Sequence, residues 1–405
     1  MRFARAIGFG LLLVVASVGA LALGERLREA RTPPTGNALA GQTTASSSPK
    51  PAEAARPSPR LRPLVLPPAY AAGSARVAPD GHSLVVPTSD WKRLAMFEIP
   101  SSDAPLVLRG QTTLAGGEWL PDGSGYVMGT YLTPPPMPLN ADGADSKMKQ
   151  QQFAVFERDG SLTSIGSGWM PSRASPDSRW IPVIDDCCPT TIRLLPRHGG
   201  ASQLLVRLAT GSPFILGWDA RGRLLYTFSG RLFAINLGGA ADEIATPTPP
   251  GSTEPSYSYV GRSPDGTAVV LQVSRSSTPL SFALTRNGTV SLATVFSDSW
   301  IGPHEILALT KTKFLGVDAS TGAERDLATK AKPTDAFFGT SSPYLLWRED
   351  STGPLHLCDT RTGADRVIEV AWTAGSPQRL DGGRFFLPSE TGPAILDSAA
   401  WLANP

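Results

Sequence analysis

Short apolar runs separated by turn-forming residues follow one another along most of this chain. Two stretches show the pattern most clearly. In the first, the runs are residues 116–120, 126–132, 153–158 and 162–165. In the second, they are residues 214–218, 224–228, 232–237 and 243–245. Runs of strand length with Gly, Pro, Asn and Asp between them predict antiparallel β-hairpins, so each stretch predicts a unit of four antiparallel strands.

A single kind of turn joins the first and second strands of these units. Pro-Asp-Gly stands at residues 79–81, 121–123 and 264–266, with Pro-Asp-Ser at 176–178 and a degenerate Ala-Arg-Gly at 220–222. Pro presets φ at the first central position of the turn. The Asp carboxylate can accept a hydrogen bond from the backbone N–H two residues further along the chain. Gly takes the positive φ that closes the turn. The motif therefore predicts a tight hairpin at each of these places.

The turns recur with a regular period. Their central residues, which are Asp80, Asp122, Asp177, Arg221 and Asp265, are separated by 42, 55, 44 and 44 residues. Weaker turn signals at residues 302–304, 341–343 and 381–383 continue the series. A supersecondary unit that repeats in this way predicts an all-β fold, a β-propeller of about eight four-stranded antiparallel blades. Seven blades is the alternative if the last unit is incomplete, and residues 64–66 are expected to close the ring by pairing with the C-terminal strands.

The repeats resemble those of the WD-repeat-like β-propellers of the TolB type. Those units run Trp-Ser-Pro-Asp-Gly, strand, gap, strand and Asp-x-x-x-Gly. Residues 119–123 and 262–266 match the first motif, and residues 317–322 and 358–363 match the turn after the third strand. The resemblance covers residues 70 to 400, and it implies an extracytoplasmic propeller that serves as a protein-binding platform. The role and partners of TolB itself are not implied, because only a tether precedes the first repeat.

The N-terminal part of the chain predicts export. Arg2 and Arg5 precede an apolar run at residues 6–23, which predicts either a cleaved signal peptide or a transmembrane signal anchor within residues 1–31. Residues 32–63 are rich in Pro, Ser and Ala and predict a disordered linker. The propeller domain is then expected at residues 64–405. We expect an extracytoplasmic protein, membrane-anchored or secreted and bacterial, that meets the membrane through its N-terminal segment only.

The charge balance argues against a nucleic-acid partner. The chain has 37 basic and 35 acidic side chains, a net charge of +2. Residues 1–31 hold five Arg and two Glu, so the part outside this segment is close to neutral. A nucleic-acid-binding domain is usually strongly basic. We expect a monomer whose partner is a protein or a cell-envelope component.

Two neighbouring units carry unusual polar residues between their second and third strands. The third unit has Asp185, Asp186, Cys187, Cys188 and Pro189 there, and the second has an insertion at residues 133–152 with Asn140, Asp142 and Asp145. Both loops are expected on the face opposite the Pro-Asp-Gly turns, where inserted loops often bind ligands. The five Asp and Asn residues are therefore candidate ligand-binding residues. The pair Asp185 and Asp186 could bind a hard cation such as Ca²⁺, although a plain polar turn is the favoured interpretation.

Other chemistry is weakly represented. The three cysteines, Cys187, Cys188 and Cys358, leave a structural disulfide and a functional thiol both open. The four histidines fall in different repeats, and no Gly-x-Ser-x-Gly motif is present. We therefore predict no catalytic residue, no metal and no cofactor. The last regular feature is a tryptophan in many of the repeats, which predicts packing between blades at Trp119, Trp169, Trp218, Trp300 and Trp347.

These observations favour a non-catalytic extracytoplasmic propeller that binds a protein or an envelope ligand. The alternative is a propeller enzyme of the lactonase, lyase or glycosidase type, with a metal or carboxylates in its central channel. A third hypothesis is a purely structural cell-surface module.

Overall fold

The computed structural model describes most of the chain beyond residue 60. It covers residues 61–403 with gaps at 101–103, 114–115, 132–150, 169, 186–189, 210, 212, 248–254, 275–278, 293–294, 311, 333–335, 349–352, 369–376 and 389–391. The chain divides into two units at residue 56, and the described residues all belong to the second, Pro57–Pro405. The expected N-terminal hydrophobic segment and most of the expected linker lie outside the described residues. No helix among the described residues is both long enough and apolar enough to cross a membrane.

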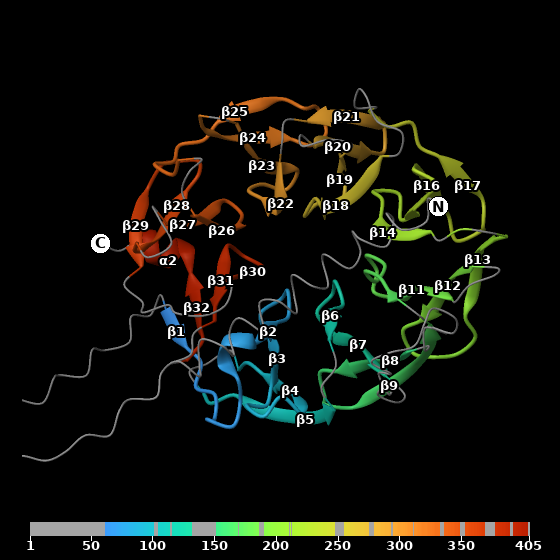
Figure 1. The fold of residues 1–405 in the computed structure, drawn as a ribbon. Helices are drawn as coiled ribbons and strands as arrows, with labels where there is room; N and C mark the ends of the chain where they lie inside the picture. Colours follow the sequence, from blue (N-terminus) through green and yellow to red (C-terminus); the bar gives the residue numbers. More distant parts are fainter. Residues whose placement is uncertain are drawn as a thin grey trace, which may run out of the picture. The chain divides into compact units, whose positions relative to one another are not determined.

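The second unit is an all-β propeller of eight four-stranded antiparallel blades, as the repeat predicts (Figure 1). Blade 1 is β2 (Arg76–Val77), β3 (Ser83–Pro87), β4 (Arg93–Glu98) and β5 (Val107–Thr113). Blade 2 is β6 (Gly117–Trp119), β7 (Gly125–Tyr131), β8 (Gln151–Glu157) and β9 (Leu162–Gly168). Blade 3 is β10 (Met170–Pro171), β11 (Trp180–Asp185), β12 (Thr190–Pro196) and β13 (Gln203–Leu208). Blade 4 is β14 (Phe214–Trp218), β15 (Leu224–Phe228), β16 (Arg231–Ile235) and β17 (Ala241–Glu243).

The other four blades follow in chain order. Blade 5 is β18 (Ser256–Arg262), β19 (Ala268–Ser274), β20 (Leu280–Thr285) and β21 (Gly288–Leu292). Blade 6 is β22 (Val295–Trp300), β23 (Glu305–Leu309), β24 (Phe314–Asp318) and β25 (Glu324–Asp326). Blade 7 is β26 (Ala336–Ser341), β27 (Tyr344–Arg348), β28 (Leu355–Asp359) and β29 (Asp365–Ile368). Blade 8 is β30 (Gln378–Leu380), β31 (Arg384–Leu387), β32 (Ala394–Asp397) and the N-terminal β1 (Leu61–Pro63).

The Pro-Asp-Gly turns have the geometry that their residues predict. Asp122 Oδ1 accepts a hydrogen bond from the Ser124 amide at 3.0 Å, and Gly123 has a φ of +67°. In the degenerate copy, residues 218–222, the aspartate stands two positions earlier, at residue 219, and Arg221 occupies its usual place. There Asp219 Oδ1 accepts bonds from the amides of Arg221 and Arg223, both at 2.8 Å. A local side-chain acceptor therefore supports the turn even where the motif is lost.

The hydrophobic core lies between the blades. Among the described residues, the buried apolar side chains form eight clusters, and each cluster joins two neighbouring blades. Trp218, Trp300 and Trp347 are buried in three of these clusters, and Trp119 packs half-buried against a fourth. The prediction that tryptophans pack between blades is confirmed for these four, and Trp169 lies outside the described residues.

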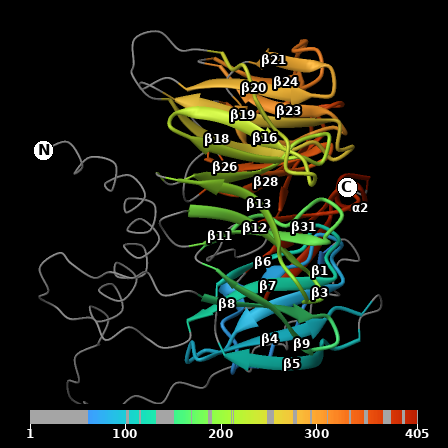
Figure 2. The same ribbon diagram turned by 90° about the vertical axis from the view of Figure 1, so that its right-hand side faces the viewer.

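The ring is closed by pairing between the two ends of the unit. Leu61 pairs with Leu396, and Pro63 pairs with Ala394. The closing strand therefore lies three residues before the expected segment 64–66. The reason is that Leu64, 3% exposed, places its side chain in the junction between blades 8 and 1. The short helix α2 (Ser398–Ala403) follows β32 directly and lies at the C-terminal end of the unit (Figure 2).

Candidate binding face on blades 1 to 3

Loops between the second and third strands lie on the face opposite the Pro-Asp-Gly turns, because successive antiparallel connections alternate between the two ends of a blade. Blades 1, 2 and 3 are consecutive, so the ends of their second strands, at Pro87, Tyr131 and Asp185, are neighbours on this face. The two loops that the sequence predicts on one face, residues 132–150 and 186–189, lie outside the described residues, so their shared face stays a prediction. The candidate residues Asn140, Asp142, Asp145, Asp186, Cys187 and Cys188 lie outside the described residues.

Asp185 is the candidate ligand that the structure describes, and its carboxylate is engaged within its own blade. Arg193, on the paired strand β12, forms an ion pair with it through Nε and also donates from Nη2. Thr191 Oγ1 donates to Oδ2 at 3.1 Å. A cation at Asp185 would therefore have to compete with a guanidinium, and ligand binding by this residue stays a prediction. Within the described ranges, no group of three or more His, Cys, Asp or Glu side chains could hold a metal ion.

Arg193 also connects blade 3 to blade 2. Its Nη1 donates to Ser202 Oγ at 2.8 Å, and its Nη2 donates to the Ser167 carbonyl at 3.0 Å. Ser167 lies on β9, the outer strand of blade 2. Removing Asp185 would leave this guanidinium without its anionic partner. The Asp185 side chain thus has a structural role at the base of the loop 186–189.

The hairpin loop of blade 1 presents an exposed tryptophan that sequence analysis missed. Trp91 is 49% exposed and has a φ of +58°. Its amide donates to the Thr88 carbonyl at 2.9 Å, and Asp90 Oδ1 accepts from the Lys92 amide at 3.1 Å. The hydrogen bond from Thr88 is the largest of the contacts that hold the pKa of Asp90 below its usual value. The loop is therefore fixed by its own hydrogen bonds, with the indole at its tip.

A hollow of about 530 Å³ lies beside this loop. Its lining residues are Ala69, Thr88, Ser89, Asp90, Lys92, Arg93 and Gln111. Arg93 Nη1 donates to Gln111 Oε1 at 3.3 Å, and Gln111 Nε2 donates to the hydroxyl of Tyr70 at 2.7 Å. The hollow thus offers charged and polar groups next to an exposed aromatic side chain.

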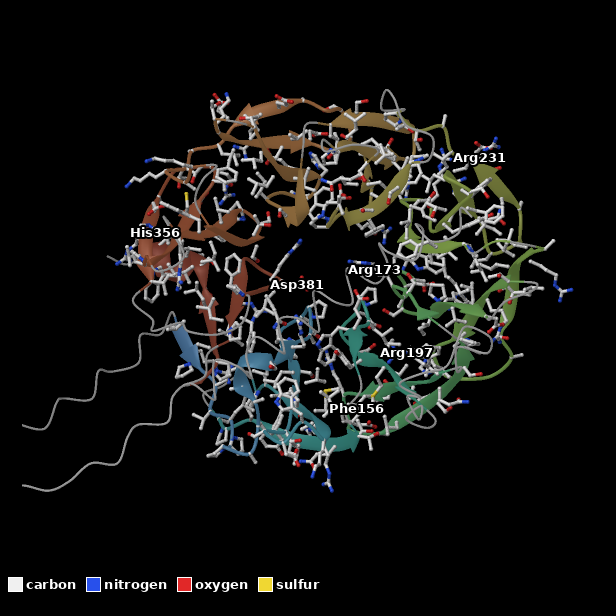
Figure 3. All side chains as sticks on the ribbon, viewed as in Figure 1. Phe156, Arg173, Arg197, Arg231, His356 and Asp381 are labelled. Carbon is white, nitrogen blue, oxygen red and sulfur yellow. The ribbon has the colours of Figure 1, made fainter. Side chains whose placement is uncertain are left out.

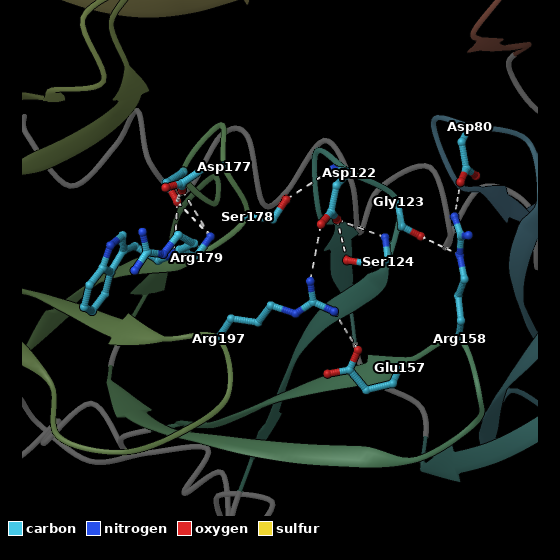
Figure 4. A network of polar contacts seen from close by, with 12 residues as sticks. Asp80, Asp122, Gly123, Ser124, Glu157, Arg158, Asp177, Ser178, Arg179 and Arg197 are labelled. Atoms are coloured by element: carbon cyan, nitrogen blue, oxygen red, sulfur yellow. Dashed lines mark hydrogen bonds and ion pairs between the residues drawn. The ribbon is translucent and has the colours of Figure 1, made fainter.

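Ion pairs on the opposite face hold blades 1 to 3 in a fixed relation (Figure 4). Arg158 of blade 2 pairs with Asp80 in the turn of blade 1. Arg197 of blade 3 reaches back to blade 2, where its Nη1 lies 3.3 Å from Asp122 Oδ2 and its Nη2 lies 2.9 Å from Glu157 Oε2. Burial raises the pKa of Asp122. Hydrogen bonds from Ser124 and Ser178 and the charge of Arg197 outweigh that effect, so the pKa lies below its usual value. These ion pairs therefore link blades 1, 2 and 3 to one another.

Cys358 is a free thiol in the core of blade 7. It is fully buried, and its Sγ donates to the Ala328 carbonyl at 3.5 Å. Burial raises its pKa to about 11. The thiolate is the reactive form of cysteine, so these conditions make Cys358 a poor nucleophile.

This environment gives a prediction for thiol reactivity. In a variant with Cys187→Ser and Cys188→Ser, we expect Cys358 to resist a thiol-specific reagent at about pH 8 while the protein is folded. The same thiol should react completely in denaturing guanidinium chloride. Absorbance of the released thiol chromophore measures both. Labelling of the folded protein at the rate of a free thiol would contradict the buried position.

Comparisons with known proteins point to the fold. No family model and no curated protein matches the chain. Similar solved structures include dipeptidyl peptidase 4 of Porphyromonas gingivalis, at 9% identity over 78% of this chain and 56% of that chain, with a TM-score of 0.55. A putative TolB from Agrobacterium tumefaciens matches at 15% identity over 65% and 83%, with a TM-score of 0.34. The C-terminal WD40 domain of Sif2 matches at 10% identity over 83% and 96%, with a TM-score of 0.46. At 9% identity the likeness to the peptidase extends to the propeller fold alone.

Proposed function

We propose that this protein is a non-catalytic, extracytoplasmic binding platform for a protein or a cell-envelope component. The partner binds the face formed by the loops between the second and third strands of blades 1 to 3. The observation that carries this proposal is the exposed indole of Trp91, held on a hydrogen-bonded hairpin beside a hollow with charged residues in its lining.

An exposed tryptophan in a fixed loop is favourable for binding. A large aromatic side chain buries much apolar surface with few rotatable bonds, and tryptophan is enriched among the residues that dominate interface energies. The Trp91 loop is already ordered by its internal hydrogen bonds, so little conformational entropy is lost when a partner binds. The charged rim of the hollow, with Asp90, Lys92 and Arg93, supplies polar groups around the indole.

The proposed location rests on the N-terminal sequence. Residues 1–31 have the basic start and the apolar run of a signal peptide or a signal anchor. Fractionation of cells that express the full chain would test this part of the proposal. Recovery of the protein in the cytoplasmic fraction would contradict it.

The binding test compares Trp91→Ala with a control of equal exposure. Leu204, on the outer strand β13, is exposed to the same fraction, 49%, so Leu204→Ala truncates a smaller exposed apolar side chain outside the Trp91 loop. With a partner identified by cross-linking in an envelope extract, we expect Trp91→Ala to weaken binding about tenfold or more. Leu204→Ala should leave the dissociation constant unchanged. Equal affinity of the two variants would refute this placement of the binding face.

A further inference from the structure

A second feature of blades 1 to 3 lies on the inner wall of the ring, which the first strand of each blade forms. The position four residues before the central turn residue is Arg76 in blade 1, Glu118 in blade 2 and Arg173 in blade 3. The same position is Gly217 in blade 4 and Gly261 in blade 5. Three consecutive blades therefore place charged side chains where the next two blades have none.

Arg173 is the central residue of this group. Its side chain is 47% exposed and lies at the inner rim of the ring (Figure 3). Its Cζ lies 5.0 Å from the ring centroid of Tyr259, and its Nη1 lies 3.8 Å from Glu118 Oε1. Its carbonyl accepts a bond from Trp218 Nε1 at 2.9 Å, which fixes the backbone. No described residue accepts a hydrogen bond from its guanidinium, so the donor fork is open to a ligand.

Arg76 and Glu118 act on the same neighbouring group. The pKa of Tyr126 is raised, mainly by burial. The charge of Arg76 lowers this pKa, and the charge of Glu118 raises it. Trp119 Nε1 donates to the Arg76 carbonyl at 3.2 Å, which ties the inner strand of blade 2 to that of blade 1. The Arg76 side chain is exposed, and within the described part of the chain no carboxylate pairs with it. The wall thus holds Arg76 on β2, Glu118 on β6 and Arg173 two residues after β10, and these three side chains carry one excess positive charge.

We propose that this inner wall binds a carboxylate of an acidic peptide segment, with the Arg173 guanidinium as the main contact and Arg76 as a second positive charge. The planar fork of arginine matches a carboxylate with two parallel hydrogen bonds. The aromatic face of Tyr259 supports the guanidinium from behind. A single excess positive charge complements a monoanion, whereas Glu118 would repel a dianionic phosphate more strongly. This proposal extends the proposed function by naming the chemistry of the partner, and it uses a surface separate from Trp91.

The test measures binding of a fluorescein-labelled peptide, which carries one glutamate and no other charged side chain and has an amidated C-terminus, to the whole protein by anisotropy. We expect Arg173→Gln to weaken binding about tenfold and Arg76→Gln to weaken it by a smaller factor. Glu118→Gln should tighten binding, because it removes the only negative charge of the group. The matched control is Arg231→Gln, which changes an exposed arginine on β16 at the outer margin of the ring (Figure 3).

Several results would overturn the proposal. They are equal affinity of Arg173→Gln and Arg231→Gln, no binding of the peptide by the unchanged protein, and tighter binding of inorganic phosphate than of the peptide. Arg173 is half-exposed, so far-UV circular dichroism should show that its variant remains folded. Trp91→Ala should bind the peptide like the unchanged protein, which separates a failure here from a failure of the proposed binding face.

Discussion

Replacing Trp300 with alanine is expected to lower the free energy of unfolding by about 3–5 kcal/mol. Trp300 ends β22 and is fully buried in the cluster between blades 5 and 6. Its ring packs with Val260 and Ala268 of blade 5 as well as with Ile306 of its own blade. Removing the ring would leave a cavity in a junction where two rigid sheets cannot easily close together. Guanidinium unfolding followed by far-UV circular dichroism measures this loss.

Phenylalanine at the same position is the control for Trp300→Ala. The indole Nε1 of Trp300 is buried and has no hydrogen-bond partner among the described residues, so phenylalanine removes an unpaired donor while keeping most of the ring volume. We expect Trp300→Phe to lose less than half of what Trp300→Ala loses. If both variants unfolded at the same denaturant concentration, packing between blades would not be what Trp300 contributes.

A chain that begins at residue 65 is expected to be less stable than one that begins at residue 57 by at least about 3 kcal/mol. The shorter chain lacks β1 and therefore the three strand pairs from Leu61 to Pro63. It also lacks Leu64, whose amide donates to the Pro393 carbonyl at 2.7 Å and whose side chain fills the last junction. Thermal unfolding of the two chains compares their stability.

Loss of β1 should also change the behaviour of the protein in solution. Without β1, the strand β32 becomes an open sheet edge, and open edges pair with other chains. We expect concentration-dependent association of the shorter chain in size-exclusion chromatography, while the chain from residue 57 elutes as one species. Identical melting temperatures and elution volumes would show that the ring does not depend on this closure.

The repeat could be predicted because its signals are local. Each Pro-Asp-Gly turn depends on residues two apart, as the bond from Ser124 to Asp122 shows, and each strand shows itself in a few apolar positions. The strands of blade 2 and blade 4 accordingly fall close to the predicted ranges. The closing strand was displaced by three residues, because the choice between Leu61 and Leu64 depends on a junction with the far end of the chain.

The candidate sites were harder to predict because their contacts are distant or depend on conformation. The ion pair of Asp185 with Arg193 arises from the register of β11 and β12. The sequence shows Asp185 only as part of an acidic pair and does not show that Arg193 already binds its carboxylate. Trp91 stands outside the repeat of interior tryptophans, but Trp180, Trp372 and Trp401 do so too, and the sequence alone therefore did not single it out. Its exposure depends on a positive φ that the sequence does not display.

The sequence by itself determined the fold class and the position of the turns, since both follow from short-range patterns repeated along the chain. It left eight or seven blades open, and the pairing of β1 with β32 completes the eighth. The tertiary structure alone decided which side chains meet. It brought Arg197 of blade 3 to Asp122 and Glu157 of blade 2, and it brought Arg173 of blade 3 to Tyr259 of blade 5. These contacts join residues 40 to 86 positions apart, and only closure of the ring sets the distances between them.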